Sequence, residues 1–430
     1  MKSILQAPFL HLLAASSSLL SQNVESRSLP RQSGWPFAPF ITSGRDIKDT
    51  QGQNVVYAGA NWPGAGEVMI PEGLQYQSIE TIVSKMKGIG MNAIRLTFAI
   101  ELVDQIYAND GVDIPLSTAF TEALGAENGT VILDQVLANN PSFTETTTRL
   151  EVYDAIAAEC AKQEIFVHLD NHMSRGAWCC NTEDGNSWFN DVDFNVDNWT
   201  RGLAYMAEHG KSWPALVSIA LRNELRSPDS NPALKESSYN WQDWYKYIQQ
   251  GTEAVHGANP DLLIFLSGLN FDTTMTPVVR GTALTPGSGT FDLADFEGYA
   301  DKLVLELHNY DNNANDCAAL QGGLHNNGYQ AMSPEEATTT NVFPVLLTEF
   351  GFNMNATEWQ RTYATCLADY MVTLKSGWFI WVLAGSYYVR DGTQDYEETW
   401  GLLNHDWSDW RSPEYVEGGL IPLIEGTASP

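Results

Sequence analysis

Residues 165–172 read Ile-Phe-Val-His-Leu-Asp-Asn-His, and residues 217–224 read Val-Ser-Ile-Ala-Leu-Arg-Asn-Glu. Each stretch starts with β-branched, aromatic or aliphatic residues and closes on polar side chains. Short runs of this character are typical of strands buried on both faces of a sheet. Eight such strands are predicted, because six further runs share the pattern, at Val55–Trp62, Asn92–Phe98, Leu262–Asn270, Lys302–Tyr310, Val345–Phe350 and Trp378–Leu383.

Longer stretches with the period of a helix separate these runs, at Ile79–Met86, Glu151–Gln163, Asn240–His256 and Glu358–Leu374. Strands that alternate with helices indicate an α/β fold with a parallel sheet. Eight of them predict a closed (β/α)8 barrel, the TIM barrel. Two long loops, Glu101–Thr148 after the second strand and Asp311–Val342 after the sixth, follow carboxyl ends, where such barrels hold their specificity loops.

The composition excludes several classes of protein and partner. The chain has 430 residues, 43% of them hydrophobic, which is ample material for a core and excludes an intrinsically disordered chain. Its 53 acidic residues against 23 basic ones give a net charge of −30. We therefore expect no nucleic-acid partner and no binding to anionic membranes.

The ends of the chain predict its compartment and its domain organisation. Lys2 and a mostly apolar stretch from Ile4 to Leu20 resemble a secretory signal peptide, with a disordered tail as the alternative. We expect residues 1–31 to be signal peptide and tail, and 32–430 to be a single domain with an extension from about 395 that packs over the barrel's side. No later run reaches the ~18–20 apolar residues of a membrane helix. We therefore expect a secreted, extracellular protein, and we expect it to be a monomer. Sequons at Asn128, Asn198 and Asn355 would permit glycosylation.

Five cysteines are present, so at least one is unpaired within the chain. Cys160 and Cys366 fall inside helical patterns, where small buried hydrophobic residues are expected. Cys179, Cys180 and Cys317 fall in loops. Our preferred pairing is a disulfide from the adjacent cysteines to Cys317. A zinc site is not expected, because no Cys-x-x-Cys pair occurs.

Polar groups close five of the predicted strands, at Arg95, Asp170–His172, Asn223–Glu224, His308–Tyr310 and Thr348–Glu349. In a barrel, side chains at the carboxyl ends of strands converge on one axial pocket. Two carboxylates would then lie in a pocket rich in aromatic residues. Paired carboxyl groups in such a pocket are typical of enzymes that hydrolyse glycosides.

From about residue 55 to 410 the sequence resembles glycoside hydrolase family 5, the cellulase-like retaining enzymes. The resemblance implies that Glu224 is the acid/base and Glu349 the nucleophile. It also implies that Leu225 stands where many members have proline. Further residues that it places at the substrate are Arg95, His172, Asn223, His308, Tyr310 and Trp381.

The same roles follow from physical chemistry. A retaining double displacement needs two carboxyl groups ~5–5.5 Å apart, one ionised and one protonated. Glu349 suits the nucleophile if Arg95 lies beside it, because a nearby cation favours the ionised form. Glu224 suits the acid if an apolar setting and a negative neighbour raise its pKa. Tyr310 could donate a hydrogen bond to the nucleophile.

Tryptophans offer flat apolar faces to sugar rings. Trp381 is expected to be one, while Trp62, Trp178 and Trp188 could equally be core or loop residues. His168 and His172 lie four residues apart on a strand with Asp170 between them. A metal site is conceivable there, but hydrogen-bonded buried histidines are favoured. We expect no metal and no cofactor.

The resulting hypothesis is a secreted retaining hydrolase of β-linked glucan, most simply an endo-β-1,4-glucanase that acts on a polysaccharide or oligosaccharide. One alternative is an exo-acting or transglycosylating β-glycosidase on another β-glycan or glucoside. A second alternative is a barrel that binds carbohydrate without hydrolysis. The presence of both carboxylates argues against the second alternative.

Overall fold

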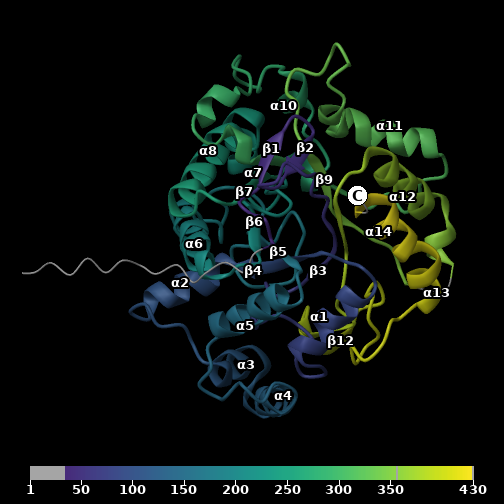
Figure 1. Cartoon of the computed structure of the whole chain (residues 1–430). Helices are drawn as coiled ribbons and strands as arrows, with labels where there is room; N and C mark the ends of the chain where they lie inside the picture. Colours follow the sequence, from purple (N-terminus) through teal and green to yellow (C-terminus); the bar gives the residue numbers. More distant parts are fainter. Residues whose placement is uncertain (1–33, 355–356, 429–430) are drawn as a thin grey trace, which may run out of the picture. The chain divides into compact units, whose positions relative to one another are not determined.

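The computed structural model describes residues 34–354 and 357–428. Eight parallel strands close into a barrel in the order β10-β3-β4-β5-β6-β7-β8-β9, ringed by helices (Figure 1). This confirms the predicted (β/α)8 barrel. The barrel strands are β3 Ala58–Trp62, β4 Ala93–Ala99, β5 Phe166–Met173, β6 Leu216–Ala220, β7 Leu263–Leu266, β8 Leu303–Asn309, β9 Val345–Phe350 and β10 Trp378–Ile380.

The eight predicted runs coincide with these strands, because each strand is buried along almost its whole length. All seven residues of β4 and all eight of β5 are buried. Their parallel register places Arg95 opposite His168 and Thr97 opposite Asp170. The register therefore carries polar residues of neighbouring strands to similar heights in the barrel.

Amphipathic helices cover the outside of the sheet. Helix α5 begins with a capping box, in which Thr148 and Glu151 satisfy each other's backbone N–H groups. Helix α8 buries Trp244, Ile248 and Val255 along one face. The helices around the barrel are α1 Ile79–Gly88, α2 Ile100–Ala108, α5 Arg149–Lys162, α6 Val196–His209, α7 Pro232–Ser238, α8 Trp241–Ala258, α9 Leu269–Asp272, α10 Thr276–Arg280, α11 Cys317–Asn327 and α12 Thr362–Leu374.

The first of the two predicted long loops is largely helical, and the second contains one α-helix. The first holds α2 and then α3 Leu116–Leu124 and α4 Ala126–Asn139, and α3 and α4 lie beyond α5 at the edge of the molecule (Figure 1). The second holds α11. Buried residues such as Phe120 and Val136 explain why the first segment folds onto the barrel.

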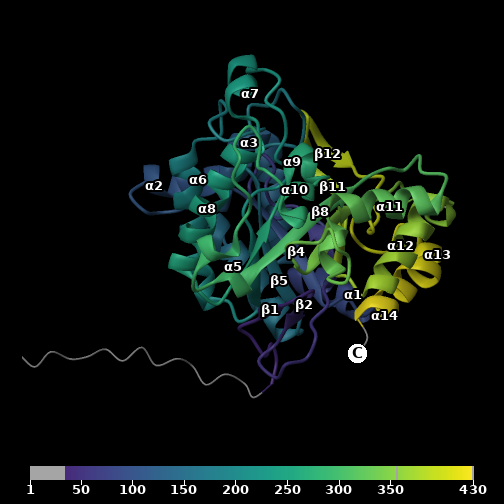
Figure 2. The same cartoon turned by 90° about the horizontal axis from the view of Figure 1, so that it is seen from above.

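Two hairpins mark opposite ends of the barrel (Figure 2). β1 Ile41–Ser43 and β2 Asp46–Lys48 form one hairpin, and β11 Ser386–Arg390 and β12 Thr393–Glu397 form the other. The chain closes with α13 Pro413–Tyr415 and α14 Ile421–Ala428, and α14 contacts α12. By its internal contacts the chain divides into Met1–Trp35 and Pro36–Pro430. The predicted signal peptide and tail, residues 1–31, and the sequon at Asn355 lie outside the described residues.

The predicted disulfide was wrong. Cys179 bonds to its neighbour Cys180, and Cys317 bonds to Cys366. Helices α11 and α12 lie against each other, which brings the Cα atoms of Cys317 and Cys366 to 5.2 Å, within disulfide reach. Cys366 is therefore paired, whereas Cys160 is a free buried thiol as expected. Within the described part of the chain, no helix is both long and apolar enough to span a bilayer.

Candidate active site

A cavity of about 450 Å³ opens at the carboxyl ends of the barrel strands. All eight site residues named from the sequence meet there. Arg95 lies fully buried beneath the cavity. The other seven line it, namely His172, Asn223, Glu224, His308, Tyr310, Glu349 and Trp381.

Arg95 is the centre of the hydrogen-bond network. One guanidinium nitrogen donates to Glu349 Oε1 at 2.7 Å and to Asn61 Oδ1 at 2.7 Å. The other donates to Asn223 Oδ1 at 2.7 Å and lies 3.0 Å from Asp170 Oδ1. Burial lowers the pKa of Arg95, but Asp170 and Glu349 outweigh burial and raise it, so Arg95 stays a fixed cation.

Glu349 is the penultimate residue of β9 and has donors on both carboxylate oxygens. Arg95 donates to Oε1, and the Tyr310 hydroxyl donates to Oε2 at 2.9 Å. Burial raises the pKa of Tyr310 well above its usual range, which keeps the hydroxyl a donor. Two charge-assisted donors suit an ionised carboxylate held in one orientation.

Glu224 follows β6 in the left-handed backbone region, with φ of 45°. Its backbone N–H donates to Asp272 Oδ2 at 2.9 Å, which holds this unusual conformation. Its Oε1 lies 3.0 Å from His308 Nδ1. Burial raises the pKa of Glu224 to about 7, so the carboxyl can hold a proton near neutral pH. Leu225, which stands where many family members have proline, is buried.

The two carboxyl groups face each other closely. An oxygen of Glu224, an oxygen of Glu349 and a ring nitrogen of His308 all lie within 4.8 Å of one another. Retaining glycosidases hold their carboxyl groups ~5–5.5 Å apart, whereas inverting ones leave ~6.5–9.5 Å for a water molecule. The observed spacing leaves no such room.

His172 and Trp381 form a second part of the site. Asp170 Oδ2 lies 2.6 Å from His172 Nδ1. Burial acts to raise the pKa of Asp170, but the Arg95 cation outweighs burial and the pKa of Asp170 is lowered. The His172 ring stacks on Trp381, with centroids 5.5 Å apart and planes 8° apart. The aspartate thus orients the histidine, and the histidine supports the tryptophan.

The metal hypothesis for His168 and His172 fails on geometry. His168 Nδ1 lies 2.8 Å from Ser218 Oγ, and its ring packs against Phe265 and Phe379. Burial lowers its pKa to about 3, as for a neutral core histidine. Among the described residues, the groups close enough to share an ion involve Glu224 with Cys179 and Cys180, or with His308 and Glu349.

The aromatic predictions divide into core and cavity. Trp62 and Trp188 are fully buried core residues. Trp178 lines the cavity beside Trp381, with centroids 6.1 Å apart. The expectation that Trp381 lies at the cavity and the core alternative for Trp62 and Trp188 both agree with the structure.

Seven cavity residues were missed, namely Cys179, Cys180, Phe271, Thr273, Arg390, Glu398 and Trp400, and the last three come from the C-terminal part of the chain. The Arg390 guanidinium lies 3.4 Å from the Trp178 ring centroid and donates to Glu398 Oε2 at 2.9 Å. The expectation that the extension from residue 395 only covers the barrel's side was therefore incomplete. Clustered tryptophans in that extension were the available signal.

The first long insertion, Glu101–Thr148, supplies none of the described residues that line the cavity. The second, Asp311–Val342, borders a neighbouring cavity of about 380 Å³. The two cavities share Thr273, His308 and Asn309. They therefore adjoin each other at the carboxyl end of the barrel.

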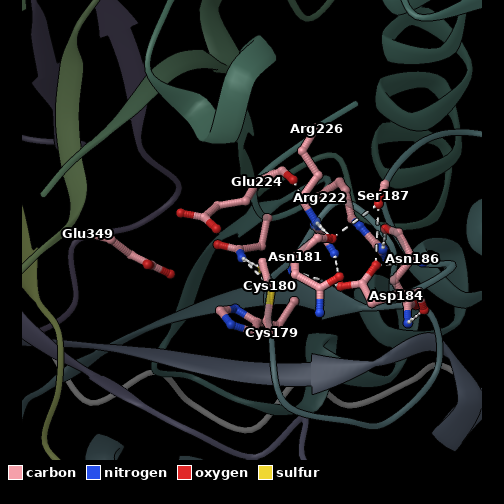
Figure 3. The surroundings of a disulfide bond; sticks show 12 residues. Cys179, Cys180, Asn181, Asp184, Asn186, Ser187, Arg222, Glu224, Arg226 and Glu349 are labelled. Atoms are coloured by element: carbon pink, nitrogen blue, oxygen red, sulfur yellow. Dashed lines mark hydrogen bonds and ion pairs between the residues drawn. A yellow bond between two sulfur atoms is a disulfide. The ribbon is translucent and has the colours of Figure 1, made fainter. Parts of the chain in front are cut away.

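The Cys179–Cys180 disulfide lies at the edge of the carboxylate pair (Figure 3). Asn223 Nδ2 lies 3.5 Å from each sulfur. Two buried arginines that follow β6 hold the loop that carries the disulfide. Arg222 donates to Asn186 O at 2.6 Å, and Arg226 donates to Asn181 O at 2.7 Å.

A family model for cellulase, glycosyl hydrolase family 5, matches residues 49–386, well over half of the chain. The chain belongs to glycosyl hydrolase family 5. This confirms the resemblance seen in the sequence. Family 5 is a family of O-glycosyl hydrolases, and the paired glutamates lie within the matched residues.

Similar proteins support this assignment. The chain is 31% identical over 398 residues to a glycosyl hydrolase 5 family protein of Chamaecyparis obtusa, covering 88% of this chain and 65% of that protein. It is 21% identical to an endoglucanase of Paenibacillus polymyxa, covering 89% and 86% of the two chains.

Solved structures share the fold. A variant of an endocellulase from Pyrococcus horikoshii, in complex with cellotetraose, has a TM-score of 0.66 at 18% identity over 90% of this chain and 99% of that chain. The catalytic domain of the major endoglucanase from Xanthomonas campestris pv. campestris has a TM-score of 0.62 at 21% identity over 90% and 100%. Both likenesses support the barrel fold of this family 5 chain.

Proposed function

We propose that this protein is a retaining β-glucan hydrolase that cleaves internal β-1,4 bonds. The observation that carries the proposal is the close pair of unlike carboxyl groups. Glu349 holds Arg95 and Tyr310 as donors, and Glu224 has a pKa that burial raises to about 7. One group is built to attack and the other to donate a proton.

In the first step Glu349 attacks the anomeric carbon while Glu224 gives its proton to the leaving oxygen. The glycosidic bond breaks, and a covalent glycosyl ester forms on Glu349. In the second step Glu224 removes a proton from water, and the water oxygen displaces Glu349 from the anomeric carbon. Both carboxyl groups return to their starting states.

The substrate class follows from the relatives and from the cavity. The names endoglucanase and endocellulase, and the cellotetraose complex of the Pyrococcus horikoshii protein, support a β-linked glucan. The Trp178, Trp381 and Trp400 rings in the cavity suit sugar faces. The second cavity beyond His308 suits a chain that runs past the cleavage point rather than ending there.

We also propose that the protein is secreted and works as a monomer. The signal-like N-terminal sequence supports secretion. Two disulfides add support, since disulfides persist chiefly in oxidising compartments.

The test is hydrolysis of a panel of soluble β-glycans, followed by proton NMR of the first product formed. We expect β-glucan to be cleaved internally, with a rapid fall in viscosity and a β-configured new end. Glu349→Ala should abolish the reaction while the variant still folds and melts in one cooperative transition. An α-configured first product would contradict the mechanism, and release of only short sugars from chain ends would contradict the endo assignment.

A further inference from the structure

Glu306 is a buried carboxyl group that the two-step reaction above does not use. It lies on β8 two residues before His308, so both side chains point to the same face of the strand. Its side chain is fully buried. A buried carboxyl group is costly unless it has partners, and the partner of Glu306 is the Thr348 hydroxyl at 2.8 Å.

Thr348 continues the contact toward the candidate acid/base. Its Oγ1 lies 3.1 Å from His308 Nε2. On the other side of the ring, His308 Nδ1 lies 3.0 Å from Glu224 Oε1. An unbroken hydrogen-bond chain therefore joins Glu306 to Glu224.

The hydrogen bonds that join Glu306 to Glu224 can be oriented in two directions. Burial lowers the pKa of His308 to about 4, so its ring carries one proton near neutral pH. If Glu306 is ionised, the Thr348 hydroxyl donates to it and accepts from His308 Nε2–H. The bare Nδ1 then accepts a proton from the protonated carboxyl of Glu224.

In the opposite direction every donor turns round. A protonated Glu306 donates to Thr348, and the Thr348 hydroxyl donates to His308 Nε2. The proton on Nδ1 then donates to an ionised Glu224. The two arrangements hold the same number of protons. In the first, the three protons are on Glu224, His308 Nε2 and Thr348. In the second, they are on Glu306, Thr348 and His308 Nδ1.

We propose that Glu306 is a positioning residue that shares one proton with Glu224 through Thr348 and His308. The proposal rests on the proposed function, in which Glu224 is in turn an acid and a base. One direction of the chain supports the acid form of Glu224, and the other supports its ionised form.

The surrounding charges are compatible with a shared proton. Burial raises the pKa of Glu224 to about 7 and that of Glu306 to about 8, so neither group is fully ionised near neutral pH. Asp272 Oδ2 lies 3.7 Å from His308 Nε2, beyond hydrogen-bond distance, and burial raises its pKa well above the usual range. The other charged or titratable groups that face this chain are Glu349, Arg95, Asp170, His172 and Arg226.

Three variants distinguish an effect of the hydrogen bonds between Glu306 and Glu224 from an effect of the charge of Glu306. Thr348→Val removes the hydroxyl and keeps both glutamates. Thr348→Ser keeps the hydroxyl and serves as the matched control. Glu306→Gln keeps the shape, and its amide donates to Thr348 as a protonated carboxyl would.

The first readout is the ring nitrogens of His308 in protein labelled with ¹⁵N-histidine, assigned with a His308→Gln variant. We expect wild type and Thr348→Ser to give averaged shifts, because both tautomers are populated. Thr348→Val and Glu306→Gln should each give the limiting shifts of the Nδ1–H tautomer.

The second readout is the basic limb of the pH profile of kcat/KM. In Thr348→Val and Glu306→Gln, a permanent Nδ1–H favours the ionised Glu224, so the limb should move down by about one pH unit, as expected for one hydrogen bond. The double variant should move no further than either single variant.

Unchanged nitrogen shifts and an unchanged limb in Thr348→Val would overturn the proposal. A limb that moves in Glu306→Gln alone would also overturn it, because Glu306 would then act through its charge. The nitrogen shifts need no substrate, so an inactive wild type would count against the proposed function and leave this readout intact.

Discussion

Glu224 and Glu349 carry the same carboxyl group, yet their neighbours differ. Glu349 accepts from a cation and a phenol, while Glu224 meets a neutral histidine in a buried setting. These surroundings suit Glu349 to attack and let Glu224 hold a proton near neutral pH. The division of roles is therefore built by partners from β4 and β8.

Glu224→Gln should lower kcat/KM on β-glucan by about 10²–10⁴-fold, because general acid catalysis is removed. An aryl glucoside with an acidic phenol needs no proton to leave, so its bond-breaking step should be much less affected. The measurement is kcat/KM for both substrates. Equal losses on both would remove Glu224 from the acid role.

Wild-type kcat/KM should fall as pH rises through about 7, where Glu224 loses its proton. The physical cause is burial, which keeps the proton on the carboxyl above the usual range. A pH profile on soluble glucan checks this. A basic limb below pH 5 would contradict the assigned acid.

At the scale of elements, the β11–β12 hairpin and the segment after it complete the cavity. Arg390 lies over the Trp178 ring and pairs with Glu398. The arginine thus holds a flat ring at the rim of the cavity. This hairpin, rather than the inserted helices α3 and α4, shapes the wall beside Trp381.

Arg390→Ala should raise KM for glucan by about 3–30-fold with little change in kcat, since cation–π contacts contribute ~0.5–2 kcal/mol. The lost contact frees the Trp178 ring without touching the carboxyl groups. Arg361→Ala is the matched control, because Arg361 is an exposed arginine paired with Glu358 away from the cavity. A fall in kcat with unchanged KM would contradict this role.

The disulfide between α11 and α12 should stabilise the fold. Cys317→Ala with Cys366→Ala should lower the free energy of unfolding by about 2–4 kcal/mol, because the bond closes a loop with a sequence separation of 49. Chemical denaturation measures this.

Reductant added to that double variant should cause little further loss of stability. The remaining Cys179–Cys180 bond joins neighbours and closes almost no loop. A large further loss would show that the bond between adjacent cysteines carries the stability instead.

At the scale of the whole molecule, buried acids link stability to pH. Burial raises the pKa of Glu72, Asp272, Glu224 and Glu306. The unfolded chain releases these protons near pH 4, while the folded chain keeps them to higher pH. The contribution of these four groups to stability therefore falls as pH rises between about 4 and 8.

We expect the melting temperature to drop by a few degrees from pH 6.5 to pH 8, with a shallower drop in Glu306→Gln. The net charge of −30 acts in the same direction through self-repulsion. Asp170 has a lowered pKa and acts oppositely only at lower pH, whereas the neutral buried His168 and His308 act oppositely up to about pH 6.5, where the unfolded histidines lose their protons. Calorimetry across this range measures the slope, and a rising melting temperature would contradict the argument.

The barrel and the place of seven polar site residues at one end of it could be predicted because they depend on local pattern, whereas Trp381 came from the resemblance to the family. A strand buried on both faces must be apolar along its length, so a polar side chain at its end stands out, as Glu349 does after Val345–Thr348. Parallel strands then carry such ends to one edge.

What the sequence determined by itself was the strand order, the carboxylate pair and the family. Only the tertiary structure decided the Cys179–Cys180 and Cys317–Cys366 bonds, the position of Arg390 over Trp178, and the chain from Glu306 to Glu224. The physical reason is the distance along the sequence over which each feature is decided. Local periodicity indicates whether a residue is buried. Contacts between residues far apart in the sequence depend on how the barrel closes and which helices lie side by side.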